Sequence, residues 1–382
     1  MFKVTFSFED GSMVETFANA GDNLLEVARS ANVAIDAPCS GNGACGKCRV
    51  QLKSGELESK KTLHISDEEY QAGWRLSCCS KISADVNVLV PDIASAYKSR
   101  MKVADLSSKE ERAIFENAKS DIQLAGIELK NSLEVVDVLM DVPSLDDTMP
   151  DNERLTRALR KYLNINRVRI PYVVLKKLPD VLRENNFAVK CVIRATSDDM
   201  YVYDIFGKDE DVVIGGLAID IGTTTVSAVL INMENGEILA KSSAGNGQIR
   251  FGADVINRIV ESQKPGGQKK LQDAVIKETI NPMIHEMCKS AKFPKDHIYR
   301  MCVASNTTMN HLFAGINAEP LRTEPYIPAF FKTNSLFASD VGIEINKDAH
   351  IIMAPNIGSY VGGDITAGTM VSQIWNRPEF SL

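Results

Sequence analysis

The stretch PCSGNGACGKC, residues 38–48, decides how the start of this chain folds. It places Cys39, Cys45 and Cys48 in one short loop, and the run RLSCC at residues 75–79 supplies further thiols. Three thiolates in a loop with one distant thiolate are the ligand pattern of a plant-type [2Fe–2S] cluster. The first gap is five residues instead of four, a variant that still places three sulfurs around one pair of irons. The sequence therefore predicts an iron–sulfur domain at the N-terminus.

The glycines of this loop support the cluster over two other uses of the cysteines. Gly41, Gly43 and Gly46 permit positive φ, so the loop can turn its amides towards the sulfurs. Zinc modules usually pair two C-x2-C units, and one such unit occurs here. The loop also fits the phosphate-binding pattern G-x4-G-K, but Cys48 replaces the Ser or Thr that would hold Mg²⁺.

The remaining cysteines fall into two groups. Cys78 and Cys79 are adjacent and point in different directions, so only one of them should face the cluster, and this pattern leaves both open. Cys191, Cys288 and Cys302 lie in apolar runs, where a free cysteine is usually a small core residue.

Composition narrows the class of protein. A length of 382 residues predicts two to four domains. The hydrophobic share of 44% is ordinary for a globular chain. The net charge of −7 argues against nucleic acid as a partner. No apolar run reaches the roughly 18 residues of a membrane-spanning helix. The N-terminus lacks the pattern of a signal peptide, so we expect a cytoplasmic protein.

In the first 91 residues, segments of alternating apolar and polar residues and segments with helical spacing predict a small mixed α/β unit. Asp22 is the expected N-cap of its first helix. The expected elements are strands at 2–9, 13–18, 48–53 and 85–90 and helices at 23–31 and 66–72.

The rest of the chain divides into three parts. Residues 92–105 lack a clear period and are expected to be a linker. Residues 106–212 mix strands with amphipathic helices and show no chemical constellation, so their expected role is structural or interfacial. From 213 to 382 we expect three consecutive strands, helices at 252–263 and 267–291, a strand at 299–304, and a glycine-rich loop before a last helix.

A second candidate site is the run AIDIGTTT, residues 218–225, between two apolar strands. A tight turn with glycine and hydroxyl groups can surround a phosphate, and an acid such as Asp220 just before it can hold Mg²⁺ through water. The alternative is an ordinary hairpin turn.

Two resemblances connect these motifs to known families. The cysteine run resembles the β-grasp ferredoxin domains fused to electron-transfer enzymes, whose terminal motif R-L-A-C-Q implies Cys78 as fourth ligand. The phosphate hairpin is similar to the first phosphate loop of the actin, sugar kinase and Hsp70 ATPase superfamily. The runs at 252–259, 304–315 and 355–368 resemble one branch of it, the reductive activators of corrinoid proteins.

This resemblance implies a multidomain α/β fold: a β-grasp ferredoxin at 1–91, a mixed α/β middle domain at 106–212, and the first lobe of an actin-like (ribonuclease H-like) ATPase at 213–382. Asn306 is expected to cap its helix or to touch nucleotide. No catalytic residue is predicted. The implied site residues are Cys39, Cys45, Cys48 and Cys78 for the cluster, Asp220 for Mg²⁺, Gly222, Thr223, Thr224 and Thr225 for phosphates, and Gly362, Gly363 and Asp364 for the nucleotide cleft.

The implied function is ATP-dependent one-electron reduction of a corrinoid protein of a methyltransferase system from Co(II) to Co(I), with electrons from an external low-potential donor. A homodimer is one expectation for its assembly. The chain ends on PEFSL, which resembles the start of an apolar strand, so we expect a truncated chain without the second lobe. The alternatives are an ATP-gated donor to another low-potential enzyme and a plain ferredoxin-type carrier.

Overall fold

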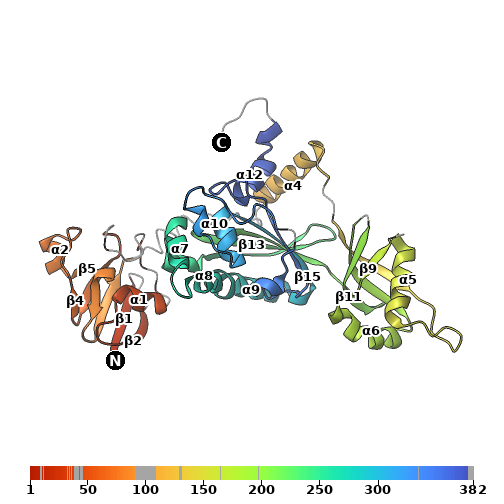
Figure 1. Cartoon of the computed structure of the whole chain (residues 1–382), viewed down its shortest axis with the longest axis horizontal. Coiled ribbons are helices and arrows are strands. Elements are labelled where there is room, and N and C mark those ends of the chain that lie inside the picture. Colours follow the sequence, from red (N-terminus) through yellow and green to blue (C-terminus); the bar gives the residue numbers. More distant parts are fainter. Residues whose placement is uncertain are drawn as a thin grey trace.

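The computed structural model of the chain contains several units built around separate sheets (Figure 1). It describes residues 1–8, 11, 13–31, 33, 35, 37, 43, 46–91, 109–128, 131–163, 165–196, 198–333 and 335–376. The expected linker at 92–105 and the closing PEFSL lie outside these residues. We call residues 1–91 the N-terminal unit, Leu133–Gly207 the middle unit, and residues 215–376 the lobe.

The N-terminal unit is a mixed sheet in the order β2-β1-β7-β3-β5 with the helix α1 packed against it. Alternation in β1 buries Val4 and Phe6 against Leu24 and Leu25 of α1, which removes apolar area from water and stabilises the unit. The bounds are β1 Phe2–Phe8, β2 Met13–Ala18, α1 Leu24–Ser30, β3 Arg49–Ser54, β4 Leu57–Ser59, α2 Asp67–Gln71, β5 Trp74–Leu76, β6 Ser80–Ile82 and β7 Val86–Val90.

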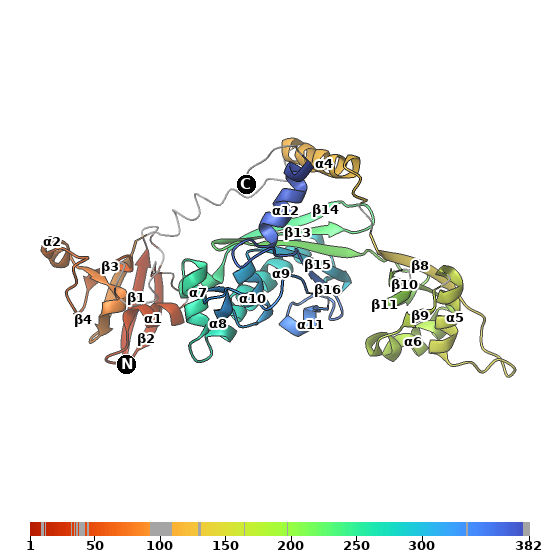
Figure 2. The same cartoon turned by 45° about the horizontal axis from the view of Figure 1, so that its top comes forward.

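The middle unit is a sheet in the order β8-β10-β11-β9, and the helices α5 and α6 cover one of its faces. The apolar stripes of the helices, with Leu155, Leu159 and Leu178, pack against inward residues of β10 such as Val189. The bounds are β8 Leu133–Leu139, α5 Asp151–Leu163, β9 Arg167–Arg169, α6 Tyr172–Glu184, β10 Ala188–Ala195 and β11 Asp199–Gly207. The helix α4, Lys109–Leu124, precedes this unit and lies beside the lobe (Figure 2).

The lobe is a sheet in the order β14-β13-β12-β15-β16, where β12, β13 and β14 pair antiparallel and β15 and β16 continue in parallel. Helices α7 to α10 cover one face, and α12 lies on the other (Figure 2). The bounds are β12 Gly215–Ile221, β13 Thr225–Asn232, β14 Ile238–Gly245, α7 Val255–Ser262, α8 Gly267–Val275, α9 Asn281–Ala291, β15 Ile298–Ser305, α10 Thr307–Ala314, α11 Ala338–Val341, β16 His350–Met353 and α12 Gly363–Ser372.

The expected elements are largely confirmed, with three informative differences. The N-cap of α1 is Asn23, whose side chain accepts from Leu25 and Glu26, whereas Asp22 accepts from the Asn19 amide. The expected helix at 267–291 contains a π-helical turn at Ile276–Ile280 between α8 and α9. Cys302 is exposed, because it points to the face of β15 opposite the core, while Cys191 and Cys288 are buried as expected.

Within the described part of the chain, no helix combines the length and apolar character needed to cross a bilayer.

Candidate functional site

Two sites can be described, one at the cysteines and one at the hairpin between β12 and β13. At the first, Cys48 stands immediately before β3, and Cys78 lies in the short turn Ser77–Cys79. Their sulfurs are 3.1 Å apart, and the Ser77 amide donates to the Cys48 carbonyl at 2.8 Å. Two sulfurs on one tetrahedral metal, with bonds of about 2.3 Å, would lie roughly 3.7 Å apart. The pair therefore fits a metal bound between the two thiols. Cys39 and Cys45 lie outside the described residues.

Cys79 also has its sulfur near this loop. It lies 3.6 Å from the sulfur of Cys78, and a Cβ added at Gly43 would stand 3.2 Å from it. The hydrogen bond between the two sulfurs lowers the pKa of the Cys48 thiol to about 6 and raises the pKa of the Cys78 thiol, so the pair shares one proton. Geometry thus pairs Cys48 with Cys78 and leaves Cys79 at the edge of the same group.

Two loop glycines have the conformation expected of them. Gly43 and Gly46 have φ values of 73° and 67°, which side chains rarely adopt. A Cβ at Gly46 would also come within 2.6 Å of His64. The loop can therefore close around the cysteines only with glycine at this position. Gly41 lies outside the described residues.

Asn23 supports this site and was missed as a functional residue. Its Oδ1 caps α1, and its Nδ2 donates to the carbonyl of Cys78 at 2.8 Å. One side chain therefore fixes both the start of α1 and the backbone of a candidate ligand. The sequence predicts a helix here with Asp22 as its cap, and no local pattern pairs Asn23 with Cys78, which is 55 positions away.

The second site is the turn from β12 to β13. The amide of Gly222 donates to the Thr225 carbonyl at 2.9 Å, and a Cβ on Gly222 would lie 2.7 Å from that carbonyl, so the turn requires glycine. Thr223, Thr224 and Thr225 are half-buried. Asp220 precedes the turn on the face of β12 opposite the helical core.

Two polar side chains hold the carbonyl side of this turn. Asn246 Nδ2 donates to the Gly222 carbonyl at 2.8 Å, and the buried Arg258 guanidinium donates to the Thr223 carbonyl. Within the described chain, the amides of Thr223 and Thr224 make no backbone hydrogen bond. Because the C=O and N–H of a trans peptide point in opposite directions, these two amides are directed away from Asn246 and Arg258. The arrangement is that of a small anion-binding concavity.

The first turn of α12 brings a second carboxylate, Asp364, to the turn between β12 and β13. Partial desolvation and the negative charge of Asp364 raise the pKa of Asp220. The two carboxylates therefore interact electrostatically, although they are far apart in the sequence. Gly362 and Gly363 pack without room for side chains: added Cβ atoms would lie 2.5 Å from the Ser305 and Ala354 carbonyls. The expected site residues of the lobe therefore meet at one place.

A buried amide network supports the start of α12. Asn356 Oδ1 accepts from Asn310 Nδ2 at 2.8 Å and from the Gly363 amide at 3.1 Å. The Nδ2 of Asn356 is buried and has no hydrogen-bond partner among the described residues. Asn306 caps α10 through the Thr308 amide at 3.0 Å. His311 is buried and bonded through both nitrogens.

Together these groups can bind a phosphate chain and a hydrated divalent cation. Two carboxylates suit Mg²⁺ held through water, and the turn amides and the N-terminus of α12 suit phosphate oxygens. Among the described residues, no group of three or more His, Cys, Asp or Glu side chains forms a ready metal cage.

Comparisons with protein families cover most of the chain. The model for the 2Fe-2S iron-sulfur cluster binding domain matches residues 7–83. The RACo linker region matches residues 122–212, and the RACo middle region matches residues 215–377. The N-terminal unit is thus a ferredoxin domain of the 2Fe–2S class.

Individual relatives agree with these assignments. Corrinoid activation enzyme RamQ from Eubacterium limosum is 27% identical over 346 residues, which is 90% of this chain and 51% of RamQ. One component of the Na(+)-translocating NADH-quinone reductase of Actinobacillus succinogenes is 35% identical over 91 residues, 23% of this chain and 22% of that protein. The chain therefore spans about half the length of RamQ.

One solved structure matches along almost the whole chain. It is that of a reductive activator for corrinoid, iron-sulfur protein, and it is 32% identical with a TM-score of 0.59. The match covers 99% of this chain and 59% of that one. The order of units, the 2Fe–2S domain and the sheet of the lobe agree with this match, and the chain belongs to the RACo family.

Proposed function

We propose that this protein is an ATP-dependent reductive activator that returns one electron to a corrinoid protein, converting Co(II) to Co(I). The observation that carries the proposal is the meeting of Asp220 and Asp364 at a phosphate-type turn in a chain that also carries a 2Fe–2S domain. A plain carrier would have no use for the second site. An external low-potential donor supplies the electron, and the corrinoid cobalt is the substrate that accepts it.

Cys39, Cys45, Cys48 and Cys78 are the proposed ligands of the cluster. The 3.1 Å separation of the Cys48 and Cys78 sulfurs supports Cys78 over Cys79 as the fourth ligand. Bound there, a plant-type cluster supplies a one-electron carrier near −400 mV. Asn23 holds the Cys78 backbone, and Gly43 and Gly46 let the loop approach the sulfurs.

Asp220 and Asp364 are the proposed second ligand shell of Mg²⁺, and Gly222 to Thr225 the proposed phosphate cradle. Asp220 must be ionised for this role. Burial, and after it the charge of the neighbouring Asp364, oppose ionisation by raising the pKa of Asp220, and a bound cation would offset the repulsion between the two carboxylates. The pair is therefore suited to binding a cation together with nucleotide. Gly362 and Gly363 place Asp364 by allowing close packing, Gly362 against the junction of β15 and α10 and Gly363 against Ala354 after β16.

ATP is needed because Co(I) is a strong reductant. For a one-electron step, each 59 mV of shortfall costs about a factor of ten in the equilibrium constant. Nucleotide binding can offset the shortfall if it favours a complex in which the cobalt is more easily reduced. That is a coupling of two sites through a conformational equilibrium, and such couplings are typically worth about 1–3 kcal/mol.

The test is anaerobic absorbance spectroscopy of a Co(II) corrinoid protein mixed with the holoprotein and a low-potential reductant, with and without MgATP. We expect the Co(I) band to appear with MgATP and to be lost in Asp220→Asn, which keeps the side-chain shape but removes the charge. Asp209→Asn, in an exposed turn of the chain, is the matched control and should behave as the wild type. Equal reduction with and without MgATP would instead favour a ferredoxin-type carrier.

A further inference from the structure

Arg29 links the N-terminal unit to the lobe. It lies in the last turn of α1 and is 6% exposed, which is unusual for an arginine on a helix surface. Its Nε donates to the Arg250 carbonyl at 3.0 Å, and its Nη1 pairs with Glu26 at 2.7 Å. Arg250 belongs to η2, the 3₁₀ turn Gly247–Phe251 of the lobe. Both views show α1 on the side of the N-terminal unit that faces α7 and α8 (Figures 1 and 2).

The turn η2 is in direct contact with the phosphate turn. Asn246 caps η2 through the Gln248 amide at 2.9 Å, and it holds the phosphate turn through two bonds of 2.8 Å, to the carbonyls of Gly222 and Thr224. Arg258 joins the same parts, because it donates to the carbonyls of Thr223 and Gly252 and to the Gln248 side chain. A movement of the phosphate turn should therefore also move the Arg250 carbonyl, which accepts the hydrogen bond from Arg29.

The other end of α1 reaches the cysteine site. Asn23 caps the helix and donates to the Cys78 carbonyl at 2.8 Å. One helix of seven residues, Leu24–Ser30, thus separates a cluster cysteine from the contact with the lobe. The helix is too short to bend appreciably, so the position of Arg29 and the position of the cysteine site are tied together.

Among the described residues, α1 contacts η2 through a polar interaction, the hydrogen bond from Arg29 to the Arg250 carbonyl. The buried apolar residues of the N-terminal unit and those of the lobe form separate clusters. Interfaces between domains that are small and polar usually permit relative movement. The docking of α1 on η2 is therefore reversible at modest cost.

We propose that the Arg29 face of α1 is a docking surface for η2 of the lobe, and that nucleotide bound at the phosphate turn favours the docked arrangement. The inference rests on the proposed function only in requiring that nucleotide binds there. The amides of Thr223 and Thr224 belong to the peptide groups whose carbonyls accept from Asn246 and Arg258. An amide that donates to phosphate polarises its peptide group and strengthens the bond accepted by the carbonyl. Nucleotide therefore stiffens Asn246, Arg258 and η2, and holds the Arg250 carbonyl in place for Arg29.

Thermodynamic linkage makes the effect reciprocal. If nucleotide favours docking, docking must raise nucleotide affinity by the same factor. A substitution on α1, far from the phosphate turn in sequence, should then weaken nucleotide binding. The protein would in this way place its electron-carrying unit only when nucleotide is present.

The test compares the wild-type holoprotein with Arg29→Glu and Arg29→Ala, using Mg²⁺ and the non-hydrolysable analogue AMP-PNP as probe. Hydrogen–deuterium exchange of peptides covering α1 and η2 reports docking, and calorimetry reports affinity. We expect AMP-PNP to slow exchange in both elements of the wild type, and this protection to be lost in both variants. Affinity should fall on the order of fivefold. Lys3→Glu on β1, which breaks an exposed pair with Glu15 on β2, is the charge-matched control and should change neither readout.

Two outcomes would overturn the inference, and they differ in what they say of the function. If AMP-PNP binds the wild type and Arg29→Glu equally and leaves exchange in α1 unchanged, docking is not coupled to nucleotide, while the proposed ATP site stands. If the wild type does not bind AMP-PNP at all, the proposed function fails and the inference fails with it. The visible absorbance of the cluster in every variant shows that the N-terminal unit is intact.

Discussion

The lobe meets its two neighbours through junctions of opposite chemistry. Towards the middle unit, Tyr299 of β15 packs with Tyr203 and Phe206 of β11 in one buried apolar cluster that also includes Ile214. The ring centres of Tyr203 and Tyr299 are 5.7 Å apart, and the Tyr299 hydroxyl lies 3.3 Å from Asp204. This junction has its own hydrophobic core, so the middle unit and the lobe should move as one body.

Towards the N-terminal unit the junction depends on Arg29 and a backbone carbonyl. A buried hydrogen bond from a charged group fixes the orientation of the two units, but it contributes much less to the free energy of their association than a packed aromatic cluster does. The comparison suggests a division of roles. The middle unit is a fixed support for the lobe, and the N-terminal unit is the part that docks and releases. Each prediction below tests one side of this division.

The largest effect is expected from Tyr299→Ala at the fixed junction. Removing a fully buried ring should lower the free energy of unfolding by about 3–5 kcal/mol, because it leaves a cavity between the two units. Exchange in β11 and β15 should rise together, as measured by hydrogen–deuterium exchange in denaturant. Tyr299→Phe keeps the ring and should cost about 1 kcal/mol, from the lost bond to Asp204. A loss below about 1 kcal/mol in the alanine variant would contradict a shared core.

A smaller effect is expected from Asn23→Ala in the docking unit. Loss of the N-cap should destabilise α1 by about 1 kcal/mol, and the Cys78 carbonyl would lose its partner. Because the two cores are separate, only the N-terminal unit should unfold earlier, with the cluster absorbance as its reporter. The unfolding of the lobe, followed by exchange in β12, should stay unchanged. Asn19→Ala, in the loop before the helix, serves as the control. A shift in both units would show that they fold as one.

Sequence reasoning succeeded where the determining contacts are local. The turn at Gly222, the hairpin strands around it and the glycines of the cysteine loop follow from short patterns, and each has the expected conformation. The three-residue strands β4, β5 and β6 were missed, because a strand that short has no readable period. For Cys302 the local pattern is readable, but it predicts the wrong burial. Its apolar neighbours predict a core position, and only the arrangement of the lobe leaves its face of β15 exposed.

The candidate sites divide in the same way. Asp220 and the residues after it were predicted from their own motif, and Asp364 from a resemblance. The electrostatic interaction between Asp220 and Asp364 depends on the packing of α12 near the end of β12, which no local pattern predicts. Asn246, Arg258 and Arg29 carry no motif of their own. Arg29 and Arg250 are 221 positions apart, so no local pattern could have paired them.

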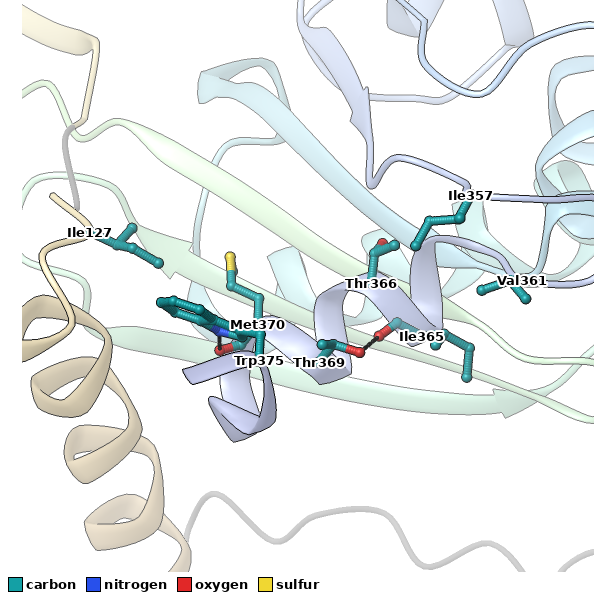
Figure 3. Close-up of a pocket in the computed structure, with 8 residues that line it drawn as sticks. All are labelled: Ile127, Ile357, Val361, Ile365, Thr366, Thr369, Met370 and Trp375. Atoms are coloured by element: carbon teal, nitrogen blue, oxygen red, sulfur yellow. Dashed lines mark hydrogen bonds between the residues drawn. The ribbon is translucent and has the colours of Figure 1, made fainter. Parts of the chain in front are cut away.

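The apolar surface of α12 is a third region to compare with the two junctions. Ile365, Met370 and Trp375 line a cavity of about 570 Å³ together with Ile127, which follows α4 (Figure 3). Unlike the Tyr299 cluster, these side chains are partly exposed: Met370 and Trp375 are 43% and 40% exposed. The wall of the cavity also includes Ile357 and Val361, which lie in the loop before α12. If nucleotide binds at the turn between β12 and β13 as proposed, movement of that loop would change this surface as well.

The smallest effect is expected from acidification, and it should separate the two junctions by pH. His297 lies at the fixed junction, with its ring 5.1 Å from Phe206 and 6.2 Å from Tyr299. Burial lowers its pKa, an effect opposed by the acidic groups of Asp204, Asp296 and Glu210 and aided by Lys177. Since the folded pKa lies below the unfolded value of about 6.5, the unfolded state binds more protons as the pH falls. Stability is therefore complete above about pH 6.5 and declines below it.

The free energy of unfolding of the joined middle unit and lobe should thus fall between about pH 7.5 and pH 5.5, and His297→Gln should reduce this slope. The effect is small because the side chain is only half-buried and solvent screens its charge. His311, which is buried and whose pKa is also lowered by burial, contributes a slope that His297→Gln leaves in place. At the docking junction, Arg29 donates to the Arg250 carbonyl, and a backbone carbonyl does not titrate. Nucleotide-dependent protection of α1 should therefore be the same at both pH values. If that protection were lost on acidification while the His297 slope was absent, the pH-sensitive junction would be the docking one, and the division of roles would have to be reversed.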